Sequence, residues 1–119
     1  MRYITFIRMV EDLGDPPPGL VEAMSRELTA AFADGTMLEA GGLSGMRDST
    51  EIRLDSGAVT QVDGPYAEGK EVVGGYVISE VRSHDEAVAS ARRLVDLHLE
   101  HWPGWDGAVE IRQMFSAFS

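Results

Sequence analysis

The chain contains no cysteine among its 119 residues. This absence excludes disulfide bonds, a zinc site built from thiolates, and catalysis by a thiol nucleophile. Long apolar runs are also missing, since none approaches the roughly 20 residues that are needed to cross a bilayer. The apolar stretch at the N-terminus is too short for a signal peptide, and Glu11 and Asp12 follow it closely. We therefore expect a cytoplasmic protein with no membrane partner.

Basic side chains are scarce. Ten Lys and Arg stand against 20 Asp and Glu, which gives a formal net charge of −10. Nucleic-acid binding requires clustered cations, and here the nearest approach to a cluster is Arg92 and Arg93. Nucleic acid is therefore not an expected partner. Because 44% of the residues are hydrophobic and 25% are charged, we expect a single globular domain spanning residues 1–119.

Apolar periodicity divides the chain into strands and two helices. Alternation and β-forming residues predict strands at residues 3–9, 36–40, 51–54, 58–62, 72–81 and 108–115. The turn Asp55-Ser56-Gly57 predicts that the third and fourth of these strands form a hairpin.

The first predicted helix follows Pro16-Pro17-Pro18 and ends at Asp34-Gly35. Its apolar stripe consists of Leu20, Met24, Leu28, Ala31 and Phe32.

The second predicted helix starts at Ser83 and stops before Pro103-Gly104. Ser83 and Glu86 have the spacing of a capping box, in which a hydroxyl and a carboxylate each satisfy a free amide. Its expected buried stripe consists of Ala87, Val88, Ala91, Leu94 and Val95.

This order of elements predicts an α+β fold of the ferredoxin-like type, an antiparallel sheet with two helices on one face. The second face of such a sheet has no helices to cover it. Because several strands carry apolar residues on both sides, we expect a second copy of the chain to pack there, giving a homodimer.

The segment VDGPYAEGKEVVGGY, residues 62–76, resembles the signature of the YCII-related, or DGPF-type, proteins. Supporting pieces are the opening strand at residues 3–7, the segment Leu38–Leu43, and Ser83–Ala87 at the start of the second helix. The resemblance covers nearly the whole chain in the right order. It implies a dimeric α+β barrel with clefts between sheet and helices.

The resemblance also bears on activity. The founding subgroup of this family is proposed to be enzymatic because of a histidine–aspartate pair in its cleft. The first predicted helix here, Leu20 to Phe32, carries no histidine. This departure favours a small-molecule-binding or regulatory protein over the alternative, a cofactor-independent acid–base enzyme of the isomerase or lyase kind.

Asp63 is the candidate catalytic residue. An aspartate at the end of a strand, facing a cleft with apolar walls, could act as general acid or base. The same Asp-Gly-Pro sequence is also typical of a turn whose carboxylate accepts amide hydrogens from its own loop. The ligand-contact residues that we predict lie nearby: Gly64, Pro65, Tyr66, Lys70 and Gly75.

We expect neither a metal nor an organic cofactor. The chain has no dinucleotide-binding or Walker pattern. His98 and His101 lie one helical turn apart but lack a convincing third ligand, and histidines in a last helical turn commonly interact with the helix dipole. Trp102 and Trp105 are expected in the core or in a subunit interface.

Overall fold

The computed structural model describes residues 1–65 and 71–115. In this part of the chain, two helices, six strands and two short 3-10 turns follow one another in the order β1 (Arg2–Met9), η1 (Glu11–Leu13), α1 (Pro18–Asp34), β2 (Met37–Gly42), η2 (Met46–Asp48), β3 (Thr50–Asp55), β4 (Ala58–Asp63), β5 (Val72–Glu80), α2 (His84–His101) and β6 (Gly107–Gln113). The predicted elements are present, although the last strand ends two residues earlier than expected.

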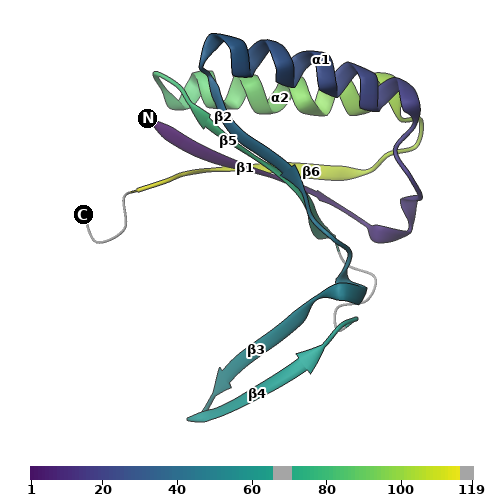
Figure 1. Ribbon diagram of the computed structural model, residues 1–119, viewed down its shortest axis with the longest axis vertical. Helices are drawn as coiled ribbons and strands as arrows, with labels where there is room; N and C mark the ends of the chain where they lie inside the picture. The colour runs from purple at the N-terminus through teal and green to yellow at the C-terminus, as the bar shows by residue number, and fades with distance from the viewer. Residues whose placement is uncertain (66–70, 116–119) are drawn as a thin grey trace.

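Four of the strands form one sheet in the order β2-β5-β1-β6, and every neighbouring pair is antiparallel. The two helices lie side by side over one face of this sheet (Figure 1). Without β3 and β4, the chain order is strand, helix, two strands, helix, strand, which is the ferredoxin-like arrangement. The predicted fold class is confirmed.

Local signals explain where the helices begin and end. Pro18 occupies the first turn of α1, where its missing amide hydrogen costs nothing, and Gly35 ends the helix in the left-handed conformation with φ 82°. At the start of α2 the Ser83 hydroxyl accepts the Glu86 amide at 3.1 Å. The Glu86 carboxylate accepts an amide in return, that of Arg82 at 3.4 Å. The hydroxyl half of the predicted capping box is therefore present, while the Glu86 carboxylate bonds to the amide of Arg82, one residue before the cap, and not to that of Ser83.

The core lies between the sheet and the helices. Along β1, Tyr3, Thr5 and Ile7 are buried against the helices, while the residues between them are only half-buried. In α2 the buried residues are Ala87, Ala91, Leu94, Leu97 and His98. Two expected core residues, Phe32 and Val88, are instead exposed by 45% and 42%. Both lie at the flanks of their helical stripes, where the sheet does not reach.

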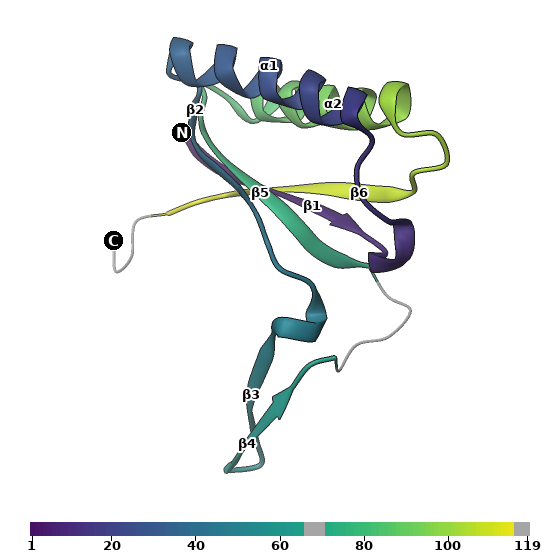
Figure 2. The same cartoon turned by 45° about the vertical axis from the view of Figure 1, so that its right-hand side comes forward.

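We call the other side of the four-stranded sheet the open face. No described helix covers it (Figures 1 and 2). Ile4, Phe6 and Ile78 point to this side and are half-buried. The ring of Tyr76 lies against Gly41, where an added Cβ would approach it to 3.0 Å, and its hydroxyl donates to Glu39 at 2.8 Å.

Strands β3 and β4 form a separate two-stranded sheet, which we call the arm (residues 50–63). Ser56 and Gly57 connect them with positive φ angles of 49° and 81°, as a two-residue hairpin turn requires. The arm leaves the body of the molecule on the side opposite the helices (Figures 1 and 2). The hairpin was predicted, but its separation from the main sheet was not.

We predict that Ser83→Ala lowers the free energy of unfolding by about 1 kcal/mol, because the Glu86 amide loses its acceptor. Chemical denaturation followed by circular dichroism measures the change. Ser25→Ala is the control, since Ser25 is exposed in the interior of α1 and alanine is the better helix former there. Equal stabilities of the two variants would contradict a capping role for Ser83.

Candidate functional site

Asp63, the predicted catalytic residue, lies at the end of β4 and is exposed in the single chain. Its carboxylate accepts a hydrogen bond from the Thr50 hydroxyl at 3.0 Å, across the first residue pair of the arm. No apolar wall surrounds it within the described residues of one chain. The observed contact is thus a cross-strand bond to a side-chain hydroxyl, and not the bond to an amide of its own loop that the turn interpretation expected.

Gly64 holds the base of the arm together. Its amide donates to the Ser49 carbonyl at 2.7 Å. A Cβ added at Gly64 would overlap the carbonyl oxygen of Met46, so only glycine allows the two segments to approach this closely. Pro65 follows and is exposed. Asp63, Gly64 and Pro65 are thus brought together against the segment that leads into β3.

The other predicted contact residues are elsewhere. Tyr66 and Lys70 lie outside the described residues. Gly75 is buried within β5, opposite Ile7 of β1 and Gly42 of β2. A Cβ at Gly75 would come within 3.3 Å of the Gly41 carbonyl oxygen, so its small size serves the close approach of two strands. Binding roles for these residues stay predictions.

A larger hollow lies along α1 and is closed by Met9 at the end of β1 and by His98 and Trp102 at the end of α2. We call it the groove; its volume is about 620 Å³. Its lining residues share an apolar or small character and carry no formal charge apart from a titratable histidine: Met9, Pro16, Leu20, Val21, Met24, Ser25, Leu28, Thr29, Phe32, Gly42, His98 and Trp102. Phe32 and Val21, exposed by 45% and 54%, form part of its wall.

His98 is the buried polar residue of the groove, with 5% of its surface exposed. Its Nδ1 lies 2.7 Å from the Leu94 carbonyl oxygen. Because a carbonyl only accepts hydrogen bonds, Nδ1 carries the proton, and in the neutral ring Nε2 is then an acceptor. Trp102 stacks near-parallel to the imidazole, with centroids 6.4 Å apart, and Trp105 packs at 4.5 Å. The ring orientation is therefore set from three sides.

The groove continues into a neighbouring hollow of about 240 Å³. Both hollows share Met9, Pro16 and Trp102 in their linings. Glu11 lines the second hollow and accepts a hydrogen bond from the Met46 amide, which ties the Leu43–Met46 segment to the end of β1. Residues 43–46 therefore connect the base of the arm to the hollow that adjoins the groove.

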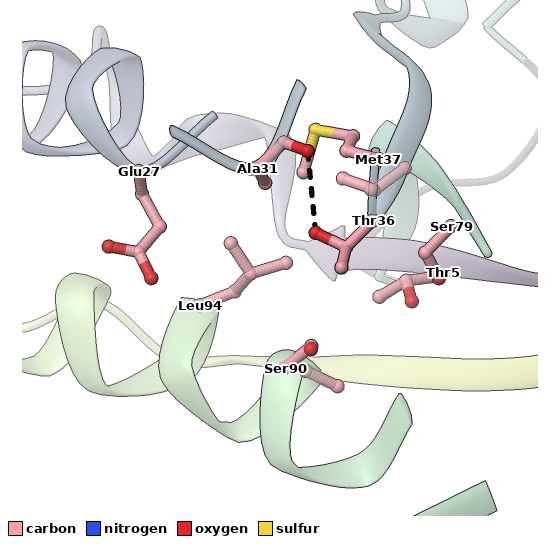
Figure 3. Close-up of a pocket in the computed structure, with 10 residues that line it drawn as sticks. Thr5, Glu27, Ala31, Thr36, Met37, Ser79, Ser90 and Leu94 are labelled. Atoms are coloured by element: carbon pink, nitrogen blue, oxygen red, sulfur yellow. Dashed lines mark hydrogen bonds between the residues drawn. The ribbon is translucent and has the colours of Figure 1, made fainter. Parts of the chain in front are cut away.

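A third, smaller cavity of about 80 Å³ lies between both helices and the sheet (Figure 3). Its lining is rich in oxygen: the hydroxyls of Thr5, Thr36, Ser79 and Ser90, and the Glu27 carboxylate. The Thr36 hydroxyl lies 3.3 Å from the Ala31 carbonyl, and Glu27 accepts from Arg93 at 3.3 Å. A cavity of this size and polarity suits a few water molecules better than a substrate.

Two titratable groups outside the groove have shifted pKa values. The Glu39 carboxylate, which accepts the Tyr76 hydroxyl, raises the pKa of Tyr76, and burial adds to the shift. The Thr36 hydroxyl and amide lower the pKa of Asp34. The Tyr76 bond therefore contributes below the ordinary tyrosine pKa and is lost as pH rises through the raised value. The Asp34 bonds contribute above its unfolded pKa and are lost as pH falls.

Sequence reasoning missed the groove, although one signal for it exists. Val21 lies about 100° around the helix from Leu20, so the apolar face of α1 is wider than a single sheet-facing stripe. His98 was assigned to the helix dipole, and its burial depends on the two tryptophans that follow α2.

Across residues 1–65 and 71–115 no group of three or more acidic or histidine side chains is placed to hold a metal ion. Neither described helix is long and apolar enough to span a membrane.

Comparison with known proteins gives one family and five matching chains among solved structures. The model of the family described as the YCII-related domain matches residues 1–97. No curated protein matches the chain. Among solved structures, the chain is similar to 5-chloro-2-hydroxyhydroquinone dehydrochlorinase (TftG) from Burkholderia phenoliruptrix AC1100, in complex with 2,5-dihydroxybenzoquinone. The two share 16% identity over 97% of this chain and 94% of that one, with a TM-score of 0.43.

We predict that Gly64→Ala destabilises the protein by about 2–4 kcal/mol, because the new methyl group overlaps the Met46 carbonyl and the base of the arm must move. Thermal and denaturant unfolding measure the loss. Gly42→Ala is the matched control, since its added Cβ would meet nothing closer than 3.9 Å. A Gly64→Ala protein as stable as the control would show that the approach of these segments is not required.

Proposed function

The chain belongs to the YCII-related domain family, and from that premise we propose that it binds a small, neutral and largely apolar molecule in the groove beside α1. In this proposal the ligand donates a hydrogen bond to Nε2 of His98. The observation that carries it is an uncharged apolar groove with one oriented, buried imidazole.

The size and lining of the groove support a small-molecule ligand. Its volume of about 620 Å³ falls within the roughly 300–1,000 Å³ of typical ligand sites, which are mostly apolar with a few placed polar groups. His98 supplies such a group, and Ser25 and Thr29 supply hydroxyls on the α1 side. With no charged lining residue and a net charge of −10, the protein is a poor host for an anion.

Ligand binding fits the groove better than catalysis does. Acid–base catalysis is most often carried by several titratable groups placed around the reacting atoms. Among the described residues that line the groove, His98 is the sole titratable one. Asp63 belongs to the arm and, in the single chain, contacts Thr50 instead.

We also propose that the protein is a homodimer. Ile4, Phe6 and Ile78 leave an apolar strip along the open face, and no described element of the same chain covers it. Burial of a sheet face of this kind is a common reason for two chains to associate.

We predict that a thermal-shift screen of neutral hydroxylated aromatic and alicyclic molecules yields ligands that raise the melting temperature. At 100 times its dissociation constant a ligand adds about 2.7 kcal/mol, which corresponds to roughly 10 °C in a domain of this size. Ser25→Trp, which places an indole in the groove, abolishes the shift. Ala30→Trp on an exposed α1 position outside the groove retains it. Equal shifts in both variants would place the ligand elsewhere.

A second prediction isolates His98. His98→Phe keeps a flat ring between the tryptophans but removes Nε2, so a hydroxylated ligand binds about tenfold more weakly. The analogue of that ligand without the hydroxyl binds both proteins equally. Isothermal titration calorimetry measures the four affinities. If both ligands lose affinity to the same extent, His98 acts through packing alone.

A further inference from the structure

The arm has one apolar and one polar face. Residues directly opposite in an antiparallel pair point to the same side, so Ile52, Leu54 and Val59 share a face with Thr50, Gln61 and Asp63. Ile52, Leu54 and Val59 are exposed by 69%, 73% and 71%. The opposite face carries the Glu51–Arg53 ion pair at 3.3 Å, together with Asp55, Ala58, Thr60 and Val62. Three large apolar side chains therefore face water on one side of the arm.

The chain itself does not cover this face. Within the described residues, β3 and β4 pair with each other and with no other strand. A lone two-stranded hairpin is marginally stable in water, and each exposed Leu, Ile or Val would gain from burial. The arm thus needs an apolar surface that this single chain does not offer.

The radius of gyration of the molecule also indicates that the arm projects from a compact body. The radius of gyration is 16.2 Å, whereas a compact domain of this length has about 13.5 Å. The excess comes from the arm, which projects on the side of the sheet that no helix covers (Figure 2).

A second copy covers both exposed surfaces at once. In a two-fold dimer each chain offers its arm to the open face of the other, so the same contact forms twice. The open face of the four-stranded sheet measures about 450 Å² and one arm face about 200 Å², from ordinary strand spacings. In this contact each chain buries one arm face and an equal patch of its open face, about 400 Å² in all. The arm contacts thus supply about half of the roughly 800 Å² per partner of a standard stable interface.

We propose that the apolar face of the arm, formed by Ile52, Leu54 and Val59, docks on the open face of a second copy and carries Asp63 into that interface. This inference rests on the homodimer proposed above. Because Asp63 shares the docking face, its carboxylate and the Thr50 hydroxyl leave water when the arm docks. The predicted acid is then placed on the partner's sheet, and the site around it is completed by two chains.

Sedimentation velocity tests the docking face. The native chain is expected to sediment as a dimer, and Leu54→Lys/Val59→Lys is expected to weaken association at least about 100-fold. The control is Ala58→Lys/Thr60→Lys, which adds the same charges to the opposite, exposed face of the arm and leaves the dimer intact. The substituted side chains belong to no core cluster of the single chain, so circular dichroism should show both variants folded.

Paramagnetic relaxation locates the docked arm. Because the chain has no cysteine, Thr60→Cys places one nitroxide on the outer face of the arm. In a mixture with isotopically labelled native chains, the methyl signals of Ile4 and Ile78 are expected to broaden, while Ile7, which faces the helices, broadens less. Broadening confined to α1 would overturn docking on the open face.

The remaining outcomes are also decisive. A dimer that survives Leu54→Lys/Val59→Lys would show that the open face associates without the arm, which overturns this inference and leaves the homodimer standing. A native chain that sediments only as a monomer would overturn both. Ligand binding in the groove is measured separately by the Ser25→Trp comparison, so its failure is distinguishable from either result.

Discussion

Two helices cover only one of the two faces of the sheet, and the rest of the structure depends on this imbalance. On the covered side, Tyr3 and Leu97 are each exposed by only 2%, and the core extends from the sheet through both helices. On the other side, Ile4, Phe6 and Ile78 are half-buried among the neighbouring strands. No described helix of the chain lies over this second face.

Those features that local chemistry determines were predictable from the sequence. Pro18 and Gly35 set the ends of α1, the Ser83 hydroxyl caps α2, and the Ser56-Gly57 turn closes the hairpin, because each effect acts within a few residues. Tertiary placement was not predictable in the same way. Nothing in residues 50–63 distinguishes strands of the main sheet from strands of a detached arm, since both show the same apolar alternation.

The candidate site also combines features that local sequence predicts with features that depend on tertiary placement. The Asp63-Gly64-Pro65 segment carried the predicted resemblance to the family, and the structure accounts for Gly64 by the close approach of Met46. The groove, in contrast, is assembled from α1, the end of β1 and the last turns of α2, which are distant in sequence. His98 faces it because Trp102 and Trp105 fold back onto the imidazole, a contact that helical periodicity alone does not predict.

The two strands of the arm are adjacent in sequence, and this affects how a newly made chain withstands proteolysis. Hairpins built from local contacts close within microseconds, far faster than two dilute chains meet. In the proposed dimer the arm is covered only after that meeting, so a chain that has not yet paired carries an exposed extension of the kind that proteases cut first. Newly made chains at low abundance would therefore be the most vulnerable, and survival would rise with concentration, so the cellular level of this protein would tend to sustain itself.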